Sequence, residues 1–378
     1  MTEFAFQWHL TDACDQRCRH CYLYNAKPEA LCAATWDEME RVLENVLDFG
    51  RTFGRTPYFY LTGGDPILHP DFWRLLERLH ALGLAATVMG NPFHVTPAAA
   101  ARMRALGVDK YQLSLDGLRD THDFFRKPGS FDATLAAIPV LREAGVPVCL
   151  MATVSARNAP ELPDLIDLAA DREADIFAFG RYCPSGADRT NGLEPLAYRA
   201  LLVECRRRIE ERKATGCRTY FHPKDHLWTL LDWEEGRFRI PPGADPATIY
   251  GGCNCGNCHL TILPDGTVMA CRRVPGSVVG NALRDRLADL WTGPMERYRD
   301  FARFAKCARC ELLRFCRGCP AVAASTALAR AVAAGAPPPG PAEAFYAPDP
   351  QCWHPVAERP QVSEPPPPLV NPTESQTP

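Results

Sequence analysis

The chain lacks the segments that carry proteins into or through a membrane. Its 378 residues contain no run of about 18 apolar residues, so no membrane-spanning helix is expected. The first residues, Met-Thr-Glu-Phe-Ala-Phe-Gln-Trp-His, include neither a basic segment nor a long apolar one, so no signal peptide is expected. These two absences predict a cytoplasmic location.

An excess of charge of one sign is also missing. The chain has 42 Lys and Arg against 45 Asp and Glu, for a net charge of −3. This balance provides no electrostatic attraction to nucleic acid or to an anionic membrane, so neither partner is expected. With 46% hydrophobic residues, the chain is long enough to bury one large core and a smaller second one.

Cysteine, in contrast, is abundant, with 17 residues. Disulfide-rich scaffolds are short and secreted, whereas this chain is long and spaces its cysteines as metal ligands are spaced. Cys14, Cys18 and Cys21 form a C-x3-C-x2-C motif directly after an apolar segment. Three thiolates on one loop can hold three irons of a cubic cluster and leave the fourth iron open to a small molecule. A zinc knuckle or three buried thiols are the alternatives.

Residues 4 to about 215 alternate between strand and helix patterns. The predicted strands cover 4–10, 58–62, 85–89, 110–115, 146–154 and 175–180. A capping box from Thr35 to Glu38 opens the first long helix, and further helices are predicted at 71–82, 99–106, 130–144, 160–168 and 194–213. Six repeats of strand and helix predict a parallel α/β sheet with right-handed crossovers, two repeats short of a closed eight-stranded barrel.

Two motifs follow predicted strands, where α/β folds place their chemistry. In Leu61-Thr-Gly-Gly-Asp-Pro66, the glycines allow the backbone to approach a ligand, and the carboxylate can accept a hydrogen bond from an ammonium group. The second motif is Gln112-Leu-Ser-Leu-Asp-Gly117, followed by Arg126. Asp116 is a candidate for contact with a ligand, but an ordinary Asp-Gly turn explains its presence equally well. Asn91, which follows the third predicted strand, is a weaker candidate for contact with the same ligand.

The cysteine motif, with Gly-Gly-Asp-Pro behind it, resembles the radical S-adenosylmethionine (radical SAM) enzymes. The resemblance implies an open (β/α)6 partial TIM barrel and a [4Fe–4S] cluster on the three cysteines. The open iron would bind SAM, and reduction would cleave SAM to a 5′-deoxyadenosyl radical. In this family the corresponding motif is Gly-Gly-Glu-Pro, and it holds the amino group of SAM. Asp65 stands where the family usually has Glu. The resemblance implies that His20 lies near the adenine of SAM and that Ser114 and Arg126 contact its carboxylate. The other implied SAM contacts are Thr62, Gly63, Gly64, Asp65, Asn91 and Asp116.

A second group of cysteines lies near the C-terminus, and its order is similar to that of a SPASM domain, which extends radical SAM enzymes that act on peptides and proteins. The resemblance implies two auxiliary [4Fe–4S] clusters, and thus three clusters and SAM as cofactors. The first auxiliary cluster would use Cys253, Cys258, Cys271 and Cys319. The second would use Cys307, Cys310, Cys316 and Cys352. Cys255 is surplus and is the alternative to Cys253, and zinc is the alternative metal for the whole group.

These patterns predict a radical SAM barrel at 4–215, a linker at 216–249, a cysteine-rich SPASM domain at 250–355 held by metal sites, and a disordered Pro-rich tail at 356–378. Cys183 follows the sixth predicted strand. It would face the barrel mouth and could donate a hydrogen atom to a substrate radical, with buried packing as the alternative.

The resemblance implies a maturase that installs a crosslink, a thioether or another oxidation in a ribosomal peptide. The expected partners are the precursor peptide, an electron donor such as flavodoxin or ferredoxin, and a separate leader-peptide-binding protein, because strand one begins at residue 4. The alternatives are an anaerobic sulfatase (formylglycine) maturase, for which no general base is identified, and a haem or quinone cofactor biosynthesis enzyme. An iron–sulfur electron carrier is disfavoured, because a carrier needs no SAM pocket.

Overall fold

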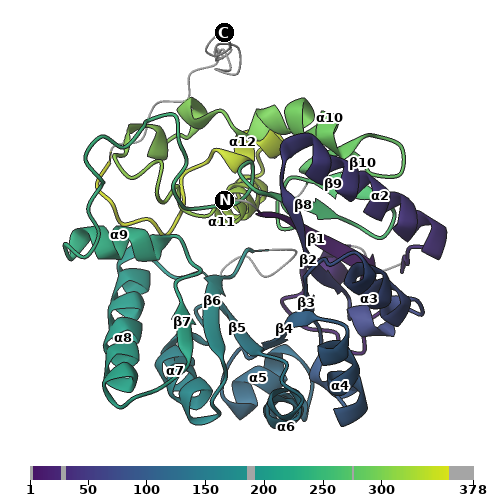
Figure 1. The fold of residues 1–378 in the computed structure, drawn as a ribbon. Helices are drawn as coiled ribbons and strands as arrows, with labels where there is room; N and C mark the ends of the chain where they lie inside the picture. The colour runs from purple at the N-terminus through teal and green to yellow at the C-terminus, as the bar shows by residue number, and fades with distance from the viewer. Residues whose placement is uncertain (1–2, 27–30, 185–191, 275, 357–378) are drawn as a thin grey trace.

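The computed structural model describes residues 3–26, 31–184, 192–274 and 276–356. Its centre is one sheet of ten strands in the order β10-β9-β8-β1-β2-β3-β4-β5-β6-β7. Strands β1 to β7 are parallel, β8 joins β1 in parallel, and β9 and β10 continue the sheet antiparallel. Figure 1 shows the parallel strands curving as an open ring with helices outside it and the C-terminal part in the gap. The predicted class, a partial α/β barrel with a C-terminal cysteine-rich domain, is confirmed.

The strands are β1 (Glu3–Thr11), β2 (Thr56–Gly63), β3 (Ala86–Met89), β4 (Val108–Ser114), β5 (Val148–Val154), β6 (Ile176–Arg181), β7 (Tyr220–His222), β8 (His259–Ile262), β9 (Thr267–Met269) and β10 (Val278–Asn281). The helices are α1 (Tyr22–Ala26), α2 (Trp36–Phe53), α3 (Phe72–Ala81), α4 (Pro97–Ala105), α5 (Arg119–Phe125), α6 (Ser130–Glu143), α7 (Leu162–Asp171), α8 (Pro195–Ala214), α9 (Leu227–Glu234), α10 (Leu287–Thr292), α11 (Pro320–Ala333) and α12 (Pro341–Phe345).

The two faces of the curved sheet differ in chemistry. On β1, Phe4 and Phe6 are buried, and their rings lie 4.5 and 5.4 Å from the ring of Phe49 on α2. Side chains point alternately to the two faces of a strand, so the intervening residues face the inside of the ring. The inward-facing residues of β1 to β4 include many polar side chains: Gln7, His9, Tyr58, Tyr60, Thr62, Thr87, Lys110, Gln112 and Ser114. Parallel strands packed on both faces are usually apolar throughout, so this inner face is not an ordinary packed core.

Helix α2 begins where the capping box predicts. The Thr35 hydroxyl accepts the N–H of Glu38 at 3.3 Å, and the Glu38 carboxylate accepts the N–H of Thr35 at 2.8 Å. The helix ends at Gly54, whose φ of 59° lies in the left-handed region. The other predicted helices of the barrel also form, with ends shifted by a few residues, and the short helices α1 and α5 are additional.

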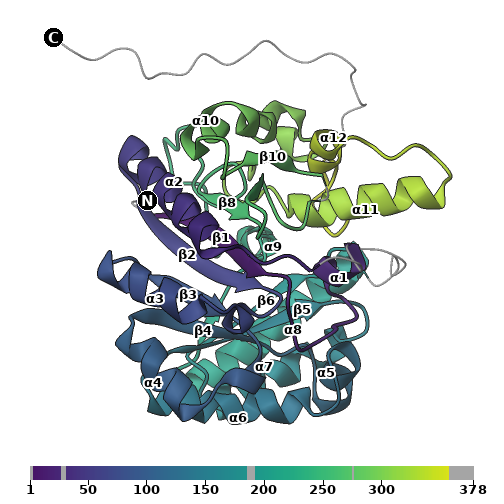
Figure 2. The ribbon, with the colours of Figure 1, turned by 90° about the vertical axis from the view of Figure 1, so that its right-hand side faces the viewer.

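The predicted linker 216–249 is wrong in part, because it contains β7 and α9. Strand β7 pairs with β6 and extends the parallel sheet by one strand. It has only three residues, too few to show an alternating pattern in the sequence. Farther along, within the predicted cysteine-rich domain, α11 is a 14-residue helix rich in alanine, the best helix former. Figure 2 shows α11 lying along the C-terminal part, above the barrel. Residues 357–378, nearly all of the predicted disordered tail, lie outside the described residues.

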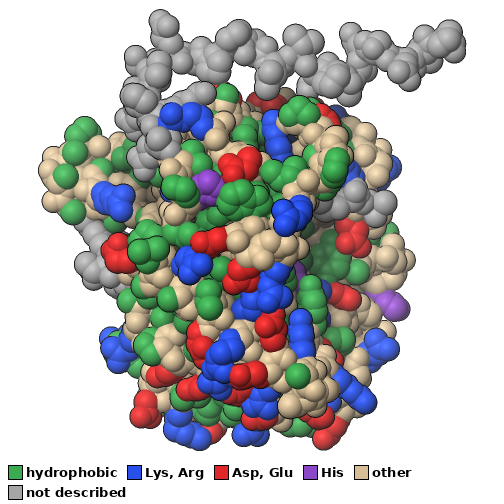
Figure 3. All heavy atoms as spheres, turned by 90° about the vertical axis from the view of Figure 1, so that its left-hand side faces the viewer, with side chains coloured by type: hydrophobic (Ala, Val, Ile, Leu, Met, Phe, Trp, Pro, Cys, Tyr) green, Lys and Arg blue, Asp and Glu red, His purple; other side chains and the backbone are tan. Residues whose placement is uncertain are grey.

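The surface over α8 carries charges of both signs. Arg207 lies in ion-pair contact with Glu204 and Glu211, and Arg212 pairs with Asp167 at 2.6 Å. Figure 3 shows this face, with basic and acidic side chains interspersed. Within the described residues, no helix has both the length and the apolar character that crossing a bilayer requires.

Candidate active site

The loop after β1 carries Cys14, Cys18 and Cys21, all half-buried. The thiol sulfur of Cys14 accepts the N–H of Gln16 at 3.4 Å and the side-chain amide of Asn91 at 3.2 Å. Burial raises the pKa of Cys18 to about 11, although Arg126, whose Nη1 lies 3.8 Å from the sulfur, acts to lower it. Metal ligation needs thiolates, and these donors are placed to stabilise negative charge on the sulfurs.

Gly63 and Gly64 allow the end of β2 to cross this loop. The φ of Gly63 is 146°, and a Cβ there would lie 2.2 Å from the carbonyl oxygen of Thr11. A Cβ on Gly64 would lie 2.2 Å from the carbonyl oxygen of Ala13. The N–H groups of Gly64 and Asp65 donate to Thr11 and Ala13 at 2.7 and 2.8 Å. These two amides are therefore engaged within the protein. The glycines fix Asp65 next to the cysteine loop.

Asp65 is fully buried, and its carboxylate needs a partner. The backbone amides of Ile67 and Asn91 act to lower its pKa, but neither carboxylate oxygen has a partner in hydrogen-bond geometry among the described residues. Burial and the nearby Asp15 raise the pKa of Asp65 to about 7. A buried carboxylate without a partner is costly, and an ammonium group beside it would offset that cost. The site therefore fits the amino group of SAM.

Asp15 and His94 complete this cluster, and neither was predicted. The ligand atoms of Asp15, Asp65 and His94 all lie within 4.8 Å of one another. Asp15 accepts a hydrogen bond from the Asn91 amide and lies 3.5 Å from Nε2 of His94. Asp15 directly follows Cys14 in the cysteine motif, and this position could have marked it in the sequence as a residue of the site.

Asp116 anchors Arg126. Its Oδ2 accepts Nε of Arg126 at 2.7 Å and lies 3.5 Å from Nε2 of His20, while its Oδ1 accepts the N–H of Thr153 at 2.8 Å. Burial acts to raise the pKa of Asp116, but Arg126 and His20 outweigh it and bring the pKa to about 2. The side chain is thus engaged with protein groups rather than free for a ligand. Ser114 ends β4, half-buried, and its contact with the SAM carboxylate stays a prediction.

Three of the four cysteines predicted to bind the first auxiliary cluster lie close to one another. Cys253, Cys271 and Cys319 lie close enough to shift one another's pKa. Cys183 joins them, since its thiol faces that of Cys319 and lowers the pKa of Cys319.

Cys258 lies directly before β8, and its carbonyl accepts the N–H of Ala5 at 2.9 Å. Burial raises the pKa of Cys258, and Arg55 and Arg317 act to lower it, but no described cysteine is among its perturbing groups. Cys255 lies near Cys253 and Cys271. The choice among these thiols as ligands, and the hydrogen-donor role of Cys183, stay predictions.

The four cysteines predicted for the second auxiliary cluster share one cavity. Its lining includes Cys307, Cys310, Cys316 and Cys352. Burial, Cys352 and Cys310 raise the pKa of Cys307 to about 12. Four convergent thiols are the ligand set that iron–sulfur clusters use, so the cavity fits one.

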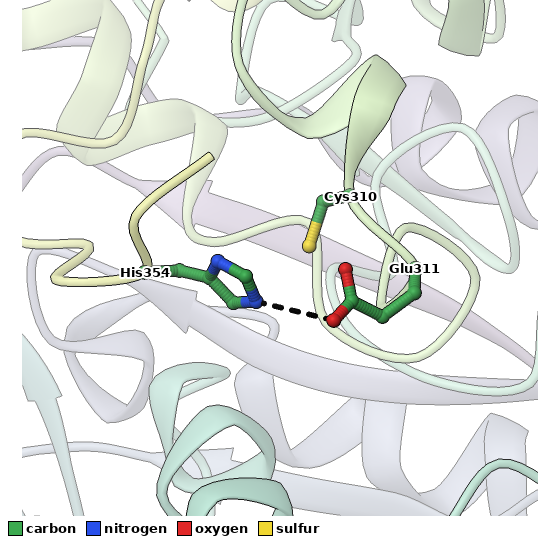
Figure 4. A group of neighbouring side chains, drawn as sticks. All are labelled: Cys310, Glu311 and His354. Carbon is green, nitrogen blue, oxygen red and sulfur yellow. Dashed lines mark ion pairs between the residues drawn. The ribbon is translucent and has the colours of Figure 1, made fainter. Parts of the chain in front are cut away.

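His354 is a further donor in this cavity that was not predicted. Figure 4 shows its imidazole pointing toward the carboxylate of Glu311, with the thiol of Cys310 beside them, and Nε2 and Oε1 are 3.5 Å apart.

Two stretches of the chain match known protein families. Residues 8–169 match the Radical SAM superfamily, and residues 253–320 match the SPASM iron–sulfur cluster-binding domain. The chain belongs to the radical SAM superfamily and carries a SPASM domain. It is therefore a radical SAM enzyme, and its two domains imply iron–sulfur clusters and SAM.

Among curated relatives, an AdoMet-dependent heme synthase of Methanosarcina barkeri is 28% identical over 83% of this chain and 90% of that protein. A pre-heme d1 synthase of Dinoroseobacter shibae is 27% identical over 76% of this chain and 72% of that protein. Among solved structures, Streptococcus suis SuiB bound to S-adenosylmethionine has a TM-score of 0.66 at 19% identity and covers 84% of this chain and 73% of SuiB. The structural likeness shows the fold alone.

Proposed function

We propose that this radical SAM enzyme modifies the side chains of a carboxylate-bearing tetrapyrrole in the synthesis of a haem-type cofactor. The observation that carries the proposal is the extent of similarity to AdoMet-dependent heme synthases. Three such enzymes are 25–28% identical over 83% of this chain and 81–90% of their own lengths. This ranks the haem alternative above the peptide maturase that the SPASM resemblance first suggested.

The structure supports a substrate site inside the barrel. The inner face of the sheet is polar, and its carboxyl end meets the cysteine loop, Asp65 and Arg126. The cluster and SAM would supply the radical that abstracts a hydrogen atom. Asp65 would orient SAM through its amino group, and the auxiliary cysteines would hold the groups that accept the substrate electron. Fixing the distance between the radical and its target and excluding water are the protein's contributions. A flavodoxin or ferredoxin would supply the reducing electron.

A peptide maturase is the second candidate. The sporulation killing factor maturation protein SkfB of Bacillus subtilis is 27% identical over 74% of this chain, although the match covers only 63% of SkfB. A precursor peptide and a leader-peptide-binding protein would be the partners in this case.

The test is turnover under anaerobic conditions with reconstituted protein, SAM and dithionite. Iron coproporphyrin III should raise 5′-deoxyadenosine formation above the substrate-free rate, and mass spectrometry should find porphyrin that has lost carboxyl groups. The triple variant C14A/C18A/C21A is the control. If porphyrins leave the rate unchanged while a peptide encoded beside this gene raises it, the peptide maturase replaces the present proposal.

A further inference from the structure

Arg317 is an enclosed cation in the C-terminal domain, next to Cys316. It is only 4% exposed, and its Nε is buried without a hydrogen-bond partner. Its φ of 62° lies in the left-handed region, which is unusual for a residue other than glycine and costs free energy. An enclosed charge and a strained backbone are both unfavourable, so this position calls for a compensating interaction.

The side chain of Arg317 connects the two sets of auxiliary cysteines. Nη2 donates to the carbonyl oxygen of Cys253, a predicted ligand of the first auxiliary cluster, and to that of Gly251 at 3.4 Å. Arg317 also lines the cavity that the four cysteines of the second auxiliary cluster share. Its guanidinium carbon lies 5.0 Å from the ring centre of Phe301. One guanidinium is therefore adjacent to both predicted cluster sites.

The contacts of Arg317 include no carboxylate. Within the part of the chain that the structure describes, no ion pair joins it to Asp or Glu, whereas the buried Arg181 pairs with two aspartates. The negative groups that act most on the pKa of Arg317 are thiols of both sets, Cys253, Cys255, Cys316 and Cys307. Carbonyl oxygens and an aromatic ring stabilise a cation without neutralising it. A [4Fe–4S] cluster on four thiolates is negatively charged, so bound clusters would supply the counter-charge.

Lys306 adds a second cation at the second cluster site. It is half-buried, and its Nζ donates to the carbonyl oxygen of Cys352 at 2.9 Å. It acts to lower the pKa of Cys307, Cys310 and Cys352. Among the described residues, no carboxylate forms an ion pair with Lys306. These three thiols all belong to the second set, so Lys306 acts on one cluster site where Arg317 acts on two.

We propose that Arg317 and Lys306 hold the reduction potentials of the auxiliary clusters high, Arg317 those of both clusters and Lys306 that of the second alone. One-electron reduction adds a negative charge to a cluster, and an enclosed cation stabilises the reduced form more than the oxidised form. A higher potential favours transfer of the substrate electron to these sites. The inference is independent of whether the substrate is a tetrapyrrole or a peptide.

The experiment measures the midpoint potentials of the auxiliary clusters in the absence of substrate. The reconstituted full chain is titrated anaerobically and followed by electron paramagnetic resonance. Replacing Cys14, Cys18 and Cys21 together by Ala removes the signal of the SAM-binding cluster, and Cys352→Ala in that protein identifies the second auxiliary cluster by its loss. Because neither SAM nor substrate takes part, the result is separate from the test of the proposed function.

Arg317→Gln keeps a donor for the Cys253 carbonyl but loses the charge. It should shift the reduction equilibrium of both clusters on the order of 10-fold toward the oxidised form, about 59 mV for one electron. Lys306→Gln should lower the potential of the second cluster alone. Arg309→Gln is the matched control, because Arg309 lies beside Cys310 but is exposed, and water screens its charge. This control should leave both potentials unchanged.

Iron content and spin quantitation verify that each variant holds its clusters. Unchanged potentials in an Arg317→Gln protein that keeps its iron overturn the proposal, and so does an equal fall in Arg317→Lys, which retains the charge. If Arg317→Gln loses iron, Lys306→Gln decides. A lower potential of the second cluster alone then supports the proposal, and an unchanged potential, or a shift equal to that of Arg309→Gln, overturns it.

Discussion

Arg181 connects the barrel to the chain segment that ends in the last auxiliary cysteine, and its replacement by Met should separate the two. The residue ends β6, and its side chain is 1% exposed. Its Nε donates to Asp225 at 2.7 Å, and Nη1 and Nη2 donate to Asp349 at 2.6 and 2.8 Å. Asp349 in turn accepts the N–H of Cys319 at 2.8 Å and lies three residues before Cys352. One guanidinium thus positions a cysteine of each auxiliary group.

The magnitude follows from what Arg181→Met leaves behind. The Asp225 and Asp349 carboxylates, 4% and 2% exposed, would remain buried without their cation. Removing one partner of a buried ion pair costs about 3–5 kcal/mol of unfolding free energy. Burial acts to raise the pKa of Asp349 and Arg181 holds it low, so the variant should regain part of the loss by taking up a proton.

The assay is urea unfolding followed by tryptophan fluorescence, together with iron content after reconstitution. We expect a loss of about 3–5 kcal/mol in the free energy of unfolding and a loss of auxiliary iron, while iron on the Cys14–Cys21 loop remains. Arg102→Met is the control, because its pair with Glu77 is about half exposed and should contribute about 0.2–1 kcal/mol. An Arg181→Met protein that unfolds within 1 kcal/mol of the control variant and keeps its iron would refute the reasoning.

Three further predictions address the SAM site and the barrel interior. The C14A/C18A/C21A variant should form no 5′-deoxyadenosine yet keep auxiliary iron, and residual SAM cleavage would contradict the assignment of the open-iron site. Asp65→Asn should weaken SAM binding on the order of 10-fold, as measured by anaerobic calorimetry, since it removes the buried charge that faces the ammonium group; unchanged affinity would place that group elsewhere. Burial lowers the pKa of His9 to about 3, so the unfolded chain takes up this proton near pH 6.5 and the folded chain does not. Stability should therefore fall as the pH drops from about 6.5 toward 3, and His9→Leu should flatten this decline in urea midpoints, whereas an identical pH profile for both proteins would show that His9 is not its source.

Local signals in the sequence determined the barrel and the cysteine motifs. The capping box at Thr35 and the apolar alternation of Phe4, Phe6 and Trp8 depend on residues a few positions apart, so they can be recognised without the fold. The C-x3-C-x2-C spacing is local in the same way, because one short loop supplies all three thiols. The family and its cofactor chemistry follow from these signals.

Tertiary structure alone decided which distant residues meet. The three-residue strand β7 forms only because β6 offers it a partner edge, so its own sequence predicts a linker. Cys183 and Cys319, more than one hundred residues apart, face each other, a contact that no spacing along the chain indicates. Spacing along the chain specifies contacts within a loop or a helix, whereas contacts between segments far apart in the sequence arise only when the sheet curves and the second domain closes its open side.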